Sequence, residues 1–284
     1  MLTALLALIL CAAQVDLPLA PSAQFEPAGA FVTVDLHATA AGPQSVAAID
    51  AILTWDPSEL QFIQALPGSY PWFLAGFLPD PDGINLDLLD GQALYTALAP
   101  LATPLVVPPG IVVASFKFKV LTGGHVGLLP SLGSFGKTRV LSTTPGVEIT
   151  GTLGAPVCVG IPGSWTDLGL GMAGSLGLPV LTGSGPQACQ ALTTLTLTNA
   201  QPNAVTWLPI GLSALNLPCK GGVLVPQLDL ILIVVTSPAG DVVLQGPWPD
   251  GIPPGTSIYY QCWFQDAGGP KGYAASNGLR STTG

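Results

Sequence analysis

Charged side chains are scarce in this sequence: 7 of the 284 residues are Lys or Arg, and 16 are Asp or Glu. A typical soluble domain has about a quarter of its residues charged. So few cations cannot neutralise a phosphate backbone, which argues against a nucleic-acid-binding protein. The two histidines, His37 and His125, also offer little for histidine-based catalysis or for a zinc site.

Signatures of catalysis and of disorder are missing as well. There is no Gly-x-Ser-x-Gly nucleophile elbow and no Cys-x-x-Cys pair. Glycine and proline are abundant, at 35 and 29 residues, but 49% of the chain is hydrophobic. Disordered chains combine low hydrophobicity with high charge, so this composition indicates folded domains. We therefore expect a folded protein that is not an enzyme.

The first residues are typical of an export signal. Residues 2–10 are almost wholly apolar and are followed by Cys11, Ala12 and Ala13. A short apolar segment that ends in small residues predicts a secretory signal peptide over residues 1–13. A membrane-spanning helix needs roughly 20 apolar residues, and Asp16 interrupts the run before that length. We expect a secreted protein, extracellular or on the cell surface, without a membrane span.

The four cysteines beyond the signal are disulfide candidates. They are Cys158, Cys189, Cys219 and Cys262. An even number of cysteines in an exported chain permits two disulfides, with three possible pairings. Buried free thiols are the alternative, because cysteine is common in protein cores.

Apolar and polar residues alternate along most of the chain, which predicts β-strands. The clearest cases are residues 31–36 and 112–120, where Phe116, Phe118 and Val120 share one face and Lys117 and Lys119 the other. Turns rich in Pro and Gly separate the strands, and a turn-rich junction lies near residue 160. The fold class is therefore all-β, with two antiparallel β-sandwich domains (jelly-roll or immunoglobulin-like) in tandem. We place them at residues 24–158, with a net charge of −6, and at residues 161–284, with −2.

One turn in the first domain resembles a family motif. Residues 51–65 contain the run Trp55-Asp56-Pro57-Ser58-Glu59-Leu60, in which Pro57 fixes φ for a turn and Asp56 can accept a backbone hydrogen bond. This aromatic-Asp-Pro-Ser-x-Leu element is similar to one in cohesin modules, and residues 112–120 are similar to a long strand of that family. The resemblance covers residues 24–158. It implies a jelly-roll sandwich related to carbohydrate-binding modules, and a protein partner such as a dockerin.

The second domain resembles a different group, the uncharacterised secreted β-domains of planctomycete-like bacteria. The similar segments are residues 169–174, 219–222, 246–249 and 275–280, which read Gly-Leu-Gly-Met-Ala-Gly, Cys-Lys-Gly-Gly, Gly-Pro-Trp-Pro and Ala-Ser-Asn-Gly-Leu-Arg. The resemblance implies export and association with the cell surface.

An acidic loop is a candidate calcium site. Its oxygen-bearing side chains are those of Asp80, Asp82, Asn85, Asp87 and Asp90. Closely spaced carboxylate and amide oxygens suit calcium, although the EF-hand spacing is not met. The alternative is a solvated loop in which Asp82-Gly83 and Asp90-Gly91 form turns.

Aromatic side chains offer a candidate sugar platform. Tyr70 and Trp72 lie in one loop, and coplanar rings there could stack on a polysaccharide. Trp263 has strand parity opposite to Phe264 and is a candidate for exposure. The alternative is that these rings fill the core.

Together these features predict a secreted, non-catalytic adhesion or scaffold protein that binds another extracellular protein through the cohesin-like module. Binding of a polysaccharide, or a purely structural role at the cell surface, is the alternative.

Overall fold

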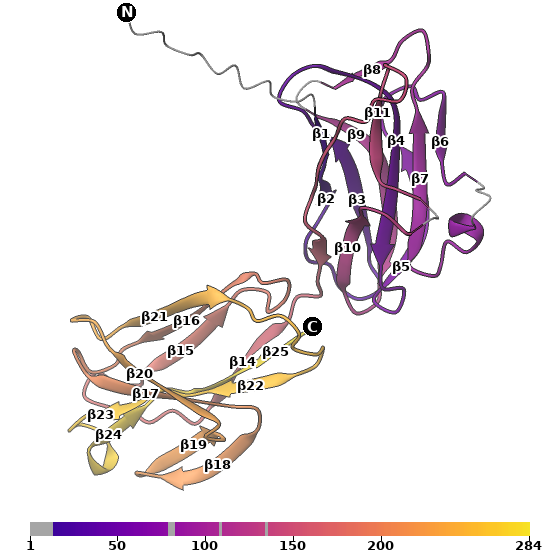
Figure 1. Cartoon of the computed structure of the whole chain (residues 1–284). Coiled ribbons are helices and arrows are strands. Elements are labelled where there is room, and N and C mark those ends of the chain that lie inside the picture. The colour runs from indigo at the N-terminus through magenta and orange to yellow at the C-terminus, as the bar shows by residue number, and fades with distance from the viewer. Residues whose placement is uncertain (1–13, 79–82, 108–109, 134–135) are drawn as a thin grey trace, which may run out of the picture. The chain divides into compact units, whose positions relative to one another are not determined.

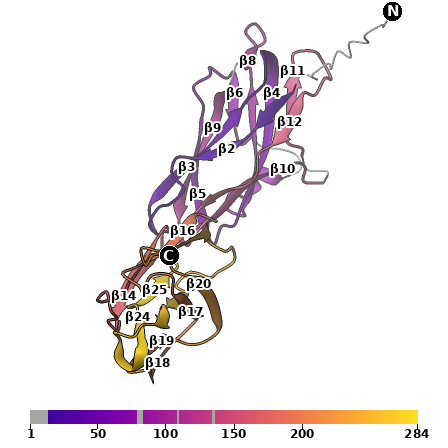
Figure 2. The same cartoon turned by 90° about the vertical axis from the view of Figure 1, so that its left-hand side faces the viewer.

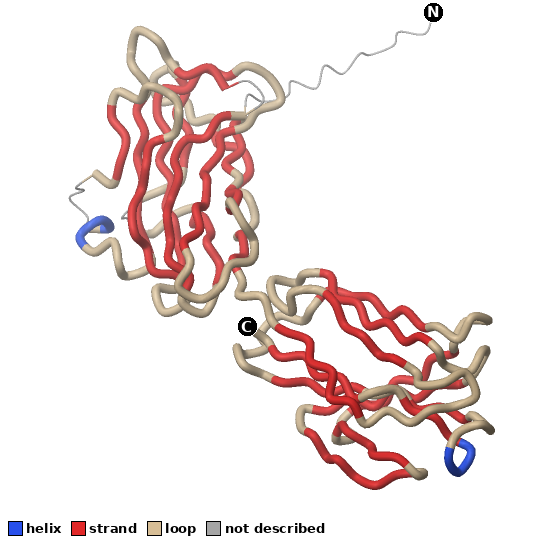
Figure 3. The backbone as a smooth tube through the Cα atoms, turned by 180° about the vertical axis from the view of Figure 1, so that it is seen from behind, coloured by secondary structure: helices blue, strands red, loops and turns tan. Residues whose placement is uncertain are grey.

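The computed structural model describes residues 14–78, 83–107, 110–133 and 136–284. The chain divides into two compact units, Met1–Val159 and Gly160–Gly284. The described residues form strands joined by turns, with two short 3₁₀ helices, η1 (Ile84–Leu86) and η2 (Pro270–Gly272), drawn in blue in Figure 3. The predicted all-β class is confirmed. No helix in the described part of the chain has the length and apolar character needed to cross a membrane.

The N-terminal unit contains two facing sheets (Figures 1 and 2). The smaller has the order β2-β3-β9-β5, and the larger has the order β13-β10-β4-β7-β6, with β8 and β11 also paired to β4. All these pairings are antiparallel, and one further pair, β1 with β12, is parallel. The strands are β1 (Val15–Leu17), β2 (Leu19–Pro21), β3 (Phe31–Ala38), β4 (Gln44–Trp55), β5 (Leu60–Pro67), β6 (Leu74–Gly76), β7 (Gln92–Leu98), β8 (Leu105–Val107), β9 (Ile111–Val120), β10 (Gly124–Leu129), β11 (Arg139–Ser142), β12 (Thr150–Leu153) and β13 (Val157–Val159).

Aromatic residues join the two sheets. Trp55 at the end of β4 lies with its ring centroid 5.5 Å from Phe118 of β9, and Tyr95 of β7 lies 5.3 Å from Phe116. Both contacts are edge-to-face, the geometry that aromatic rings prefer in cores. Phe116 and Phe118 are fully buried, as the alternation along β9 predicts. The sandwich core therefore lies between β4–β7 and β9.

The C-terminal unit has a central seven-stranded sheet, with the order β14-β25-β22-β17-β23-β24 and with β20 paired to β17. A three-stranded sheet, β15-β16-β21, and the hairpin β18-β19 complete it. The strands are β14 (Ser164–Gly169), β15 (Val180–Ser184), β16 (Leu192–Thr198), β17 (Val205–Gly211), β18 (Ala214–Cys219), β19 (Gly222–Pro226), β20 (Leu230–Val235), β21 (Val242–Pro247), β22 (Ser257–Tyr260), β23 (Trp263–Gln265), β24 (Tyr273–Ala275) and β25 (Gly278–Thr282).

Both faces of this central sheet are covered around β17 and β23. On one face, Leu208 and Phe264 pack in a cluster with Leu181 and Leu197 of the three-stranded sheet. On the other face, Trp263 packs in a second cluster with residues that include Leu224 of the hairpin. The predicted exposure of Trp263 is therefore wrong: its side chain is buried. Strand parity places it opposite Phe264, as expected, but the hairpin covers that second face.

The cysteines differ from the predicted two disulfides. Cys158 and Cys189 are disulfide-bonded, whereas Cys219 and Cys262 are free thiols. The two free cysteines pack on opposite faces of the central sheet, Cys262 in the cluster with Phe264 and Cys219 beside the cluster with Trp263. A disulfide between them would have to pass through the sheet. Burial raises the pKa of the Cys262 thiol to about 12, so this thiol stays protonated at physiological pH.

Candidate protein-binding face

A charged residue interrupts the apolar strand β4. Asp50 lies between Ile49 and Ala51, both fully buried in the core, so strand alternation directs its side chain to the outer face of the larger sheet. On that face, Asp50 stands in register with Thr96 of β7 on one side and Arg139 of β11 on the other. Three neighbouring strands thus place three polar side chains in one row.

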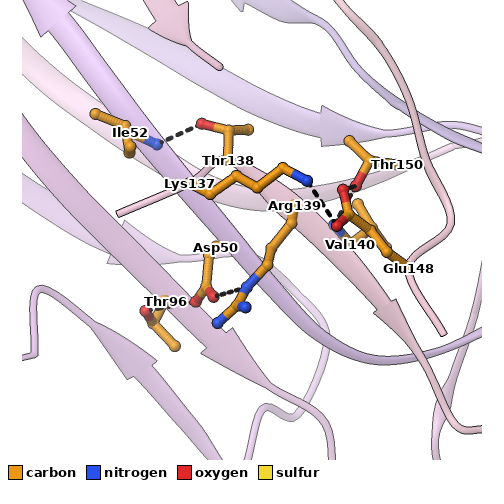
Figure 4. Close-up of polar contacts among 9 residues, drawn as sticks. All are labelled: Asp50, Ile52, Thr96, Lys137, Thr138, Arg139, Val140, Glu148 and Thr150. Carbon is orange, nitrogen blue, oxygen red and sulfur yellow. Dashed lines mark hydrogen bonds and ion pairs between the residues drawn. The ribbon is translucent and has the colours of Figure 1, made fainter. Parts of the chain in front are cut away.

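The row is joined by hydrogen bonds (Figure 4). Thr96 Oγ1 donates to Asp50 Oδ1 over 2.8 Å, and Arg139 Nε donates to Asp50 Oδ2 over 2.9 Å. The Asp50 side chain is only 13% exposed, whereas that of Arg139 is 45% exposed. The nearly buried carboxylate therefore fixes the direction of a half-exposed guanidinium.

Arg139 keeps donors for another molecule. Among the described residues, its hydrogen bond to Asp50 is the one that the side chain makes, and it uses Nε alone. The two terminal amino groups remain, and such groups can bind a carboxylate in a bidentate manner. The chemistry that the free amino groups offer is recognition of an anion.

An aliphatic row lies beside the polar one. Register places Leu98 of β7 next to Ala48, which is flanked by Leu141 of β11, and Leu74 of β6 lies beyond Leu98. Leu74 is exposed, and Leu98 and Leu141 are half-buried. We call these residues together, Asp50, Thr96, Arg139, Leu74, Leu98 and Leu141, the Arg139 face.

A second ion pair lies next to the Arg139 face. Lys137 Nζ donates to Glu148 Oε2 over 2.8 Å, and Thr150 Oγ1 donates to the other oxygen of the same carboxylate over 2.8 Å (Figure 4). The hydrogen bond from Lys137 is the main reason that the pKa of Glu148 is lowered. Both groups are substantially exposed, so this pair contributes little to stability. It leaves Lys137 engaged and Arg139 as the available cation.

The smaller sheet presents a different outer face. Lys117 and Lys119 of β9 point outward there, and Lys117 Nζ lies 4.5 Å from the centroid of the exposed Phe31 ring. Neither lysine forms an ion pair with a described residue. This face carries ammonium groups without a carboxylate partner among the described residues, rather than a guanidinium that a carboxylate orients.

The turn that carries the family resemblance has the predicted local structure. Asp56 Oδ1 accepts hydrogen bonds from Ser58 N over 2.8 Å and from Ser58 Oγ over 2.6 Å, and Leu60 after the turn is fully buried. These bonds, the side-chain one first, lower the pKa of Asp56. The neighbouring Glu59 is half-buried, and desolvation, followed by repulsion from Asp56, raises its pKa.

The aromatic pair does not form a flat platform. The rings of Tyr70 and Trp72 lie 4.8 Å apart, but their planes are inclined by 67°. Tyr70 Oη donates to the Thr103 carbonyl over 2.5 Å, so the tyrosine fixes a loop. The coplanar arrangement needed for stacking on a sugar is therefore not present at this pair.

The acidic loop has only some of its predicted ligands in the described part of the chain. Asp80 and Asp82 lie outside the described residues. The Asn85 side chain bonds backbone groups of Leu78 and Leu94, and Asp87 and Asp90 each accept a backbone N–H two residues ahead. Within the described ranges, no three His, Cys, Asp or Glu residues group together as metal ligands. The calcium site stays a prediction.

The sequence analysis did not identify the Arg139 face. The usable signal was Asp50 itself, a lone charge inside the otherwise apolar strand of residues 46–53. Its cross-strand partner lies 89 residues further along the chain, and no local pattern joins the two. Only the strand order brings them together.

Comparisons with known proteins give distant likenesses. No protein-family model and no curated protein matches the chain. Among solved structures, the chain is similar to the sixth cohesin of scaffoldin B from Acetivibrio cellulolyticus, which was solved with a dockerin. The two share 14% identity with a TM-score of 0.40, and the match covers 52% of this chain and 99% of that one. It is also similar to the third ScaC cohesin of that organism, solved with the ScaB dockerin, at 18% identity and a TM-score of 0.39, covering 52% and 97%.

A third likeness is to the OlpA cohesin of Clostridium thermocellum, also solved with a dockerin, at 13% identity and a TM-score of 0.39, covering 52% and 99%. These identities are too low to assign the chain to a family. The predicted resemblance of residues 161–284 to planctomycete-type domains has no support in the comparisons.

Proposed function

We propose that this chain is a non-catalytic extracellular binding protein that recognises another protein through the Arg139 face of its N-terminal unit. The observation that carries the proposal is the half-exposed Arg139, which the nearly buried Asp50 orients while its terminal amino groups stay available. Arginine held in this way is a common energetic centre of protein interfaces.

The chemistry of the face defines the partner. A carboxylate on the partner would pair with Arg139, and aliphatic side chains would pack on Leu74, Leu98 and Leu141. Interfaces combine such a centre with surrounding apolar contacts that exclude water. We therefore expect a protein partner that presents an Asp or Glu among apolar residues.

The sequence resemblance to cohesin modules supports a protein partner. The three solved cohesins named above are described in complex with dockerins. The predicted export signal over residues 1–13 agrees with a partner outside the cytoplasm. We propose a dockerin-like or other extracellular protein, and leave polysaccharide binding and a structural role as outcomes of the test.

Affinity capture tests the Arg139 face. The full chain would be immobilised and exposed to the secreted and envelope fractions of the organism that produces it. We expect one protein to be retained in stoichiometric amount by the wild type, and at least tenfold less by R139Q. The matched control is K117Q on the outer face of the opposite sheet, which should retain as much as the wild type. Thermal melts of the three proteins confirm that each is folded.

Washes separate the alternatives. Equal retention by R139Q and the wild type would contradict the proposed face. Release by soluble polysaccharide would support carbohydrate binding, and release by a chelator would support the calcium prediction. Retention of nothing would favour a structural role.

A further inference from the structure

Strand β20 of the C-terminal unit is wholly aliphatic, and five of its six side chains are exposed. Its sequence is Leu-Ile-Leu-Ile-Val-Val, and the exposed fractions reach 52% at Leu230, 67% at Ile233 and 62% at Val235. Successive residues of a strand point to opposite faces, so both faces of β20 are apolar and accessible. Isolated exposed apolar residues are common, but a contiguous patch of this kind marks an interaction surface.

The backbone of β20 is also available along one edge. The strand pairs with β17 in six consecutive residue pairs, and with no other strand of the C-terminal unit. Thr236 N donates to Ala204 O, just beyond the strand. In an antiparallel sheet, residue pairs that exchange backbone hydrogen bonds alternate with pairs that do not. Because Thr236 bonds Ala204, the residues of β20 that bond β17 are Leu230, Leu232 and Val234. Ile231, Ile233 and Val235 then point their N–H and C=O groups to the open edge.

The usual protection of an edge strand is missing. Natural edge strands carry charges, proline or a bulge that prevent pairing with another chain. Strand β20 has none of these, and its register with β17 is regular. The edge strand β21 of the same unit differs, because it ends in Gly246-Pro247 and alternates between half-buried and exposed residues. The open edge of β20 is therefore suited to strand addition.

We propose that β20 pairs with β20 of a second copy of this chain, in antiparallel register about a two-fold axis at Ile233. In this register Ile231 faces Val235 of the copy, and Ile233 faces Ile233. The three residues with outward backbone groups then bond one another, which gives six intermolecular hydrogen bonds. The interface is isologous, so it closes at two chains.

Charge supports this occupant. The strand itself carries no charge, in a chain whose net charge is −9. The nearest carboxylate is that of Asp229, and the register separates the two copies of it by eight residue positions along the strands. That distance is about 27 Å, well beyond the screening length at physiological salt. Apolar residues thus meet apolar residues with no opposed charges.

The exposed area of these side chains sets an upper limit on the apolar surface that the strand pair can bury. Leu228, Leu230, Ile231, Leu232, Ile233 and Val235 are each between 39% and 67% exposed. Together they present on the order of 500 Å² of mostly apolar surface. A standard interface buries about 800 Å² per partner, somewhat more than half of it apolar.

A groove next to β20 extends this surface. It has a volume of about 200 Å³ and is lined by residues that include Trp207, Pro209, Leu228, Ile231 and Trp263. Ile231 and Ile233 lie opposite Pro209 and Trp207 in the β17–β20 register, so they share this face of the sheet. Pairing of two copies would continue the apolar face of each groove across the new strand pair.

Analytical ultracentrifugation of the full chain tests the proposal. We expect the wild type to form a dimer in the micromolar range, and I233K to raise the dissociation constant at least tenfold. The matched control is V243K on edge strand β21, where Val243 is 64% exposed. It should dimerise like the wild type, because it adds the same charge to a different strand of the same unit.

A proline variant separates pairing of the backbone from apolar contact. The N–H of Ile233 points to the open edge, so I233P removes one intermolecular hydrogen bond per chain, two of the six in a dimer, and none to β17. We expect I233P to melt within a few degrees of the wild type as a monomer and to have lost the dimer. A wild type that stays monomeric up to about 1 mM would overturn the proposal, as would a dimer that persists in I233K and I233P, or assembly that continues beyond two chains.

Discussion

Asp266 shows how much one buried carboxylate can organise. It is almost fully buried, and it accepts hydrogen bonds from Ser175 N over 2.9 Å and from Gly268 N over 2.8 Å, as well as from the Ser175 hydroxyl. Desolvation acts to raise the pKa of Asp266, but the hydrogen bonds from Ser175 and Gly268 outweigh it, and the pKa is lowered. Two loops 91 residues apart in sequence are thus joined at one side chain.

The variant D266N should lose about 2 kcal/mol of unfolding free energy at neutral pH, because bonds to a charged acceptor are replaced by weaker or mismatched ones. A carboxylate whose pKa is lower in the folded state stabilises the protein above its unfolded-state pKa, and this contribution disappears as the pH falls through the folded-state value. The difference between wild type and D266N, measured by urea unfolding, should therefore shrink toward pH 3.

The control for this prediction is D241N, since the Asp241 carboxylate makes no hydrogen bond within the described residues. It should unfold like the wild type at both pH values. A difference between D266N and wild type that is independent of pH would contradict the role of the charge.

At the scale of single residues, the sequence predicted those contacts that a residue makes with others close to it in the chain. Asp56 was expected to accept a backbone hydrogen bond beyond Pro57, and Ser58 donates it. The exposure of Trp263 and the pairing of Cys219 and Cys262 depend on the hairpin and on the sheet that lies between the thiols. Those features are set by the assembly of distant strands, so local pattern could not predict them.

Strand β15 illustrates a constraint at the scale of an element. The indole of Trp165, from β14, lies directly on the backbone of Gly183, so that a Cβ atom there would come within 2.1 Å of the ring. Trp165 Nε1 also donates to Gly185 O over 3.1 Å. This contact helps to pack the three-stranded sheet on the seven-stranded one.

The variant G183A should destabilise the C-terminal unit by about 2 kcal/mol, because the extra methyl group overpacks the contact with Trp165. Its match is G246A, on β21 of the same sheet, where a Cβ would meet nothing within 4 Å. Urea unfolding should separate the two variants clearly. Equal stability of G183A and G246A would show that the indole moves aside at no cost.

The strands themselves were largely predictable. Alternation over residues 31–36 and 112–120 predicted β3 and β9, because each has one face in the core and one in solvent. Alternation of apolar and polar residues does not predict where a strand is interrupted when a polar side chain within the segment is buried. Over residues 258–264 the chain does not form one continuous strand but β22 and β23, with Gln261 and Cys262 between them. The buried Gln261 side chain there bonds backbone groups of three other segments.

At the scale of the whole molecule, the chain contains two separate hydrophobic cores. One surrounds Phe116 and Phe118 in the N-terminal unit, and the other surrounds Leu208 and Phe264 in the C-terminal unit. Each unit has its own sheets, with no strand pairing shared between them among the described residues. Single domains generally unfold in one cooperative step, and two cores permit two.

We therefore expect two transitions in differential scanning calorimetry. F116A removes a fully buried ring and should cost about 3–5 kcal/mol, lowering only the transition of the N-terminal unit. G183A should lower only the other transition. One transition that shifts with both variants would show instead that the two cores unfold together.

The two-fold closure at β20 has a consequence for valency. A pair of chains joined there carries two Arg139 faces, so a partner displayed in many copies on a surface could be held at two points. The second contact then forms at the high effective concentration set by the first, and overall avidity can exceed the single-site affinity by 10²–10⁴ when the geometry allows both. Pairing along an uncharged edge strand of six residues would thus strengthen the attachment of the protein to a surface that displays its partner in many copies.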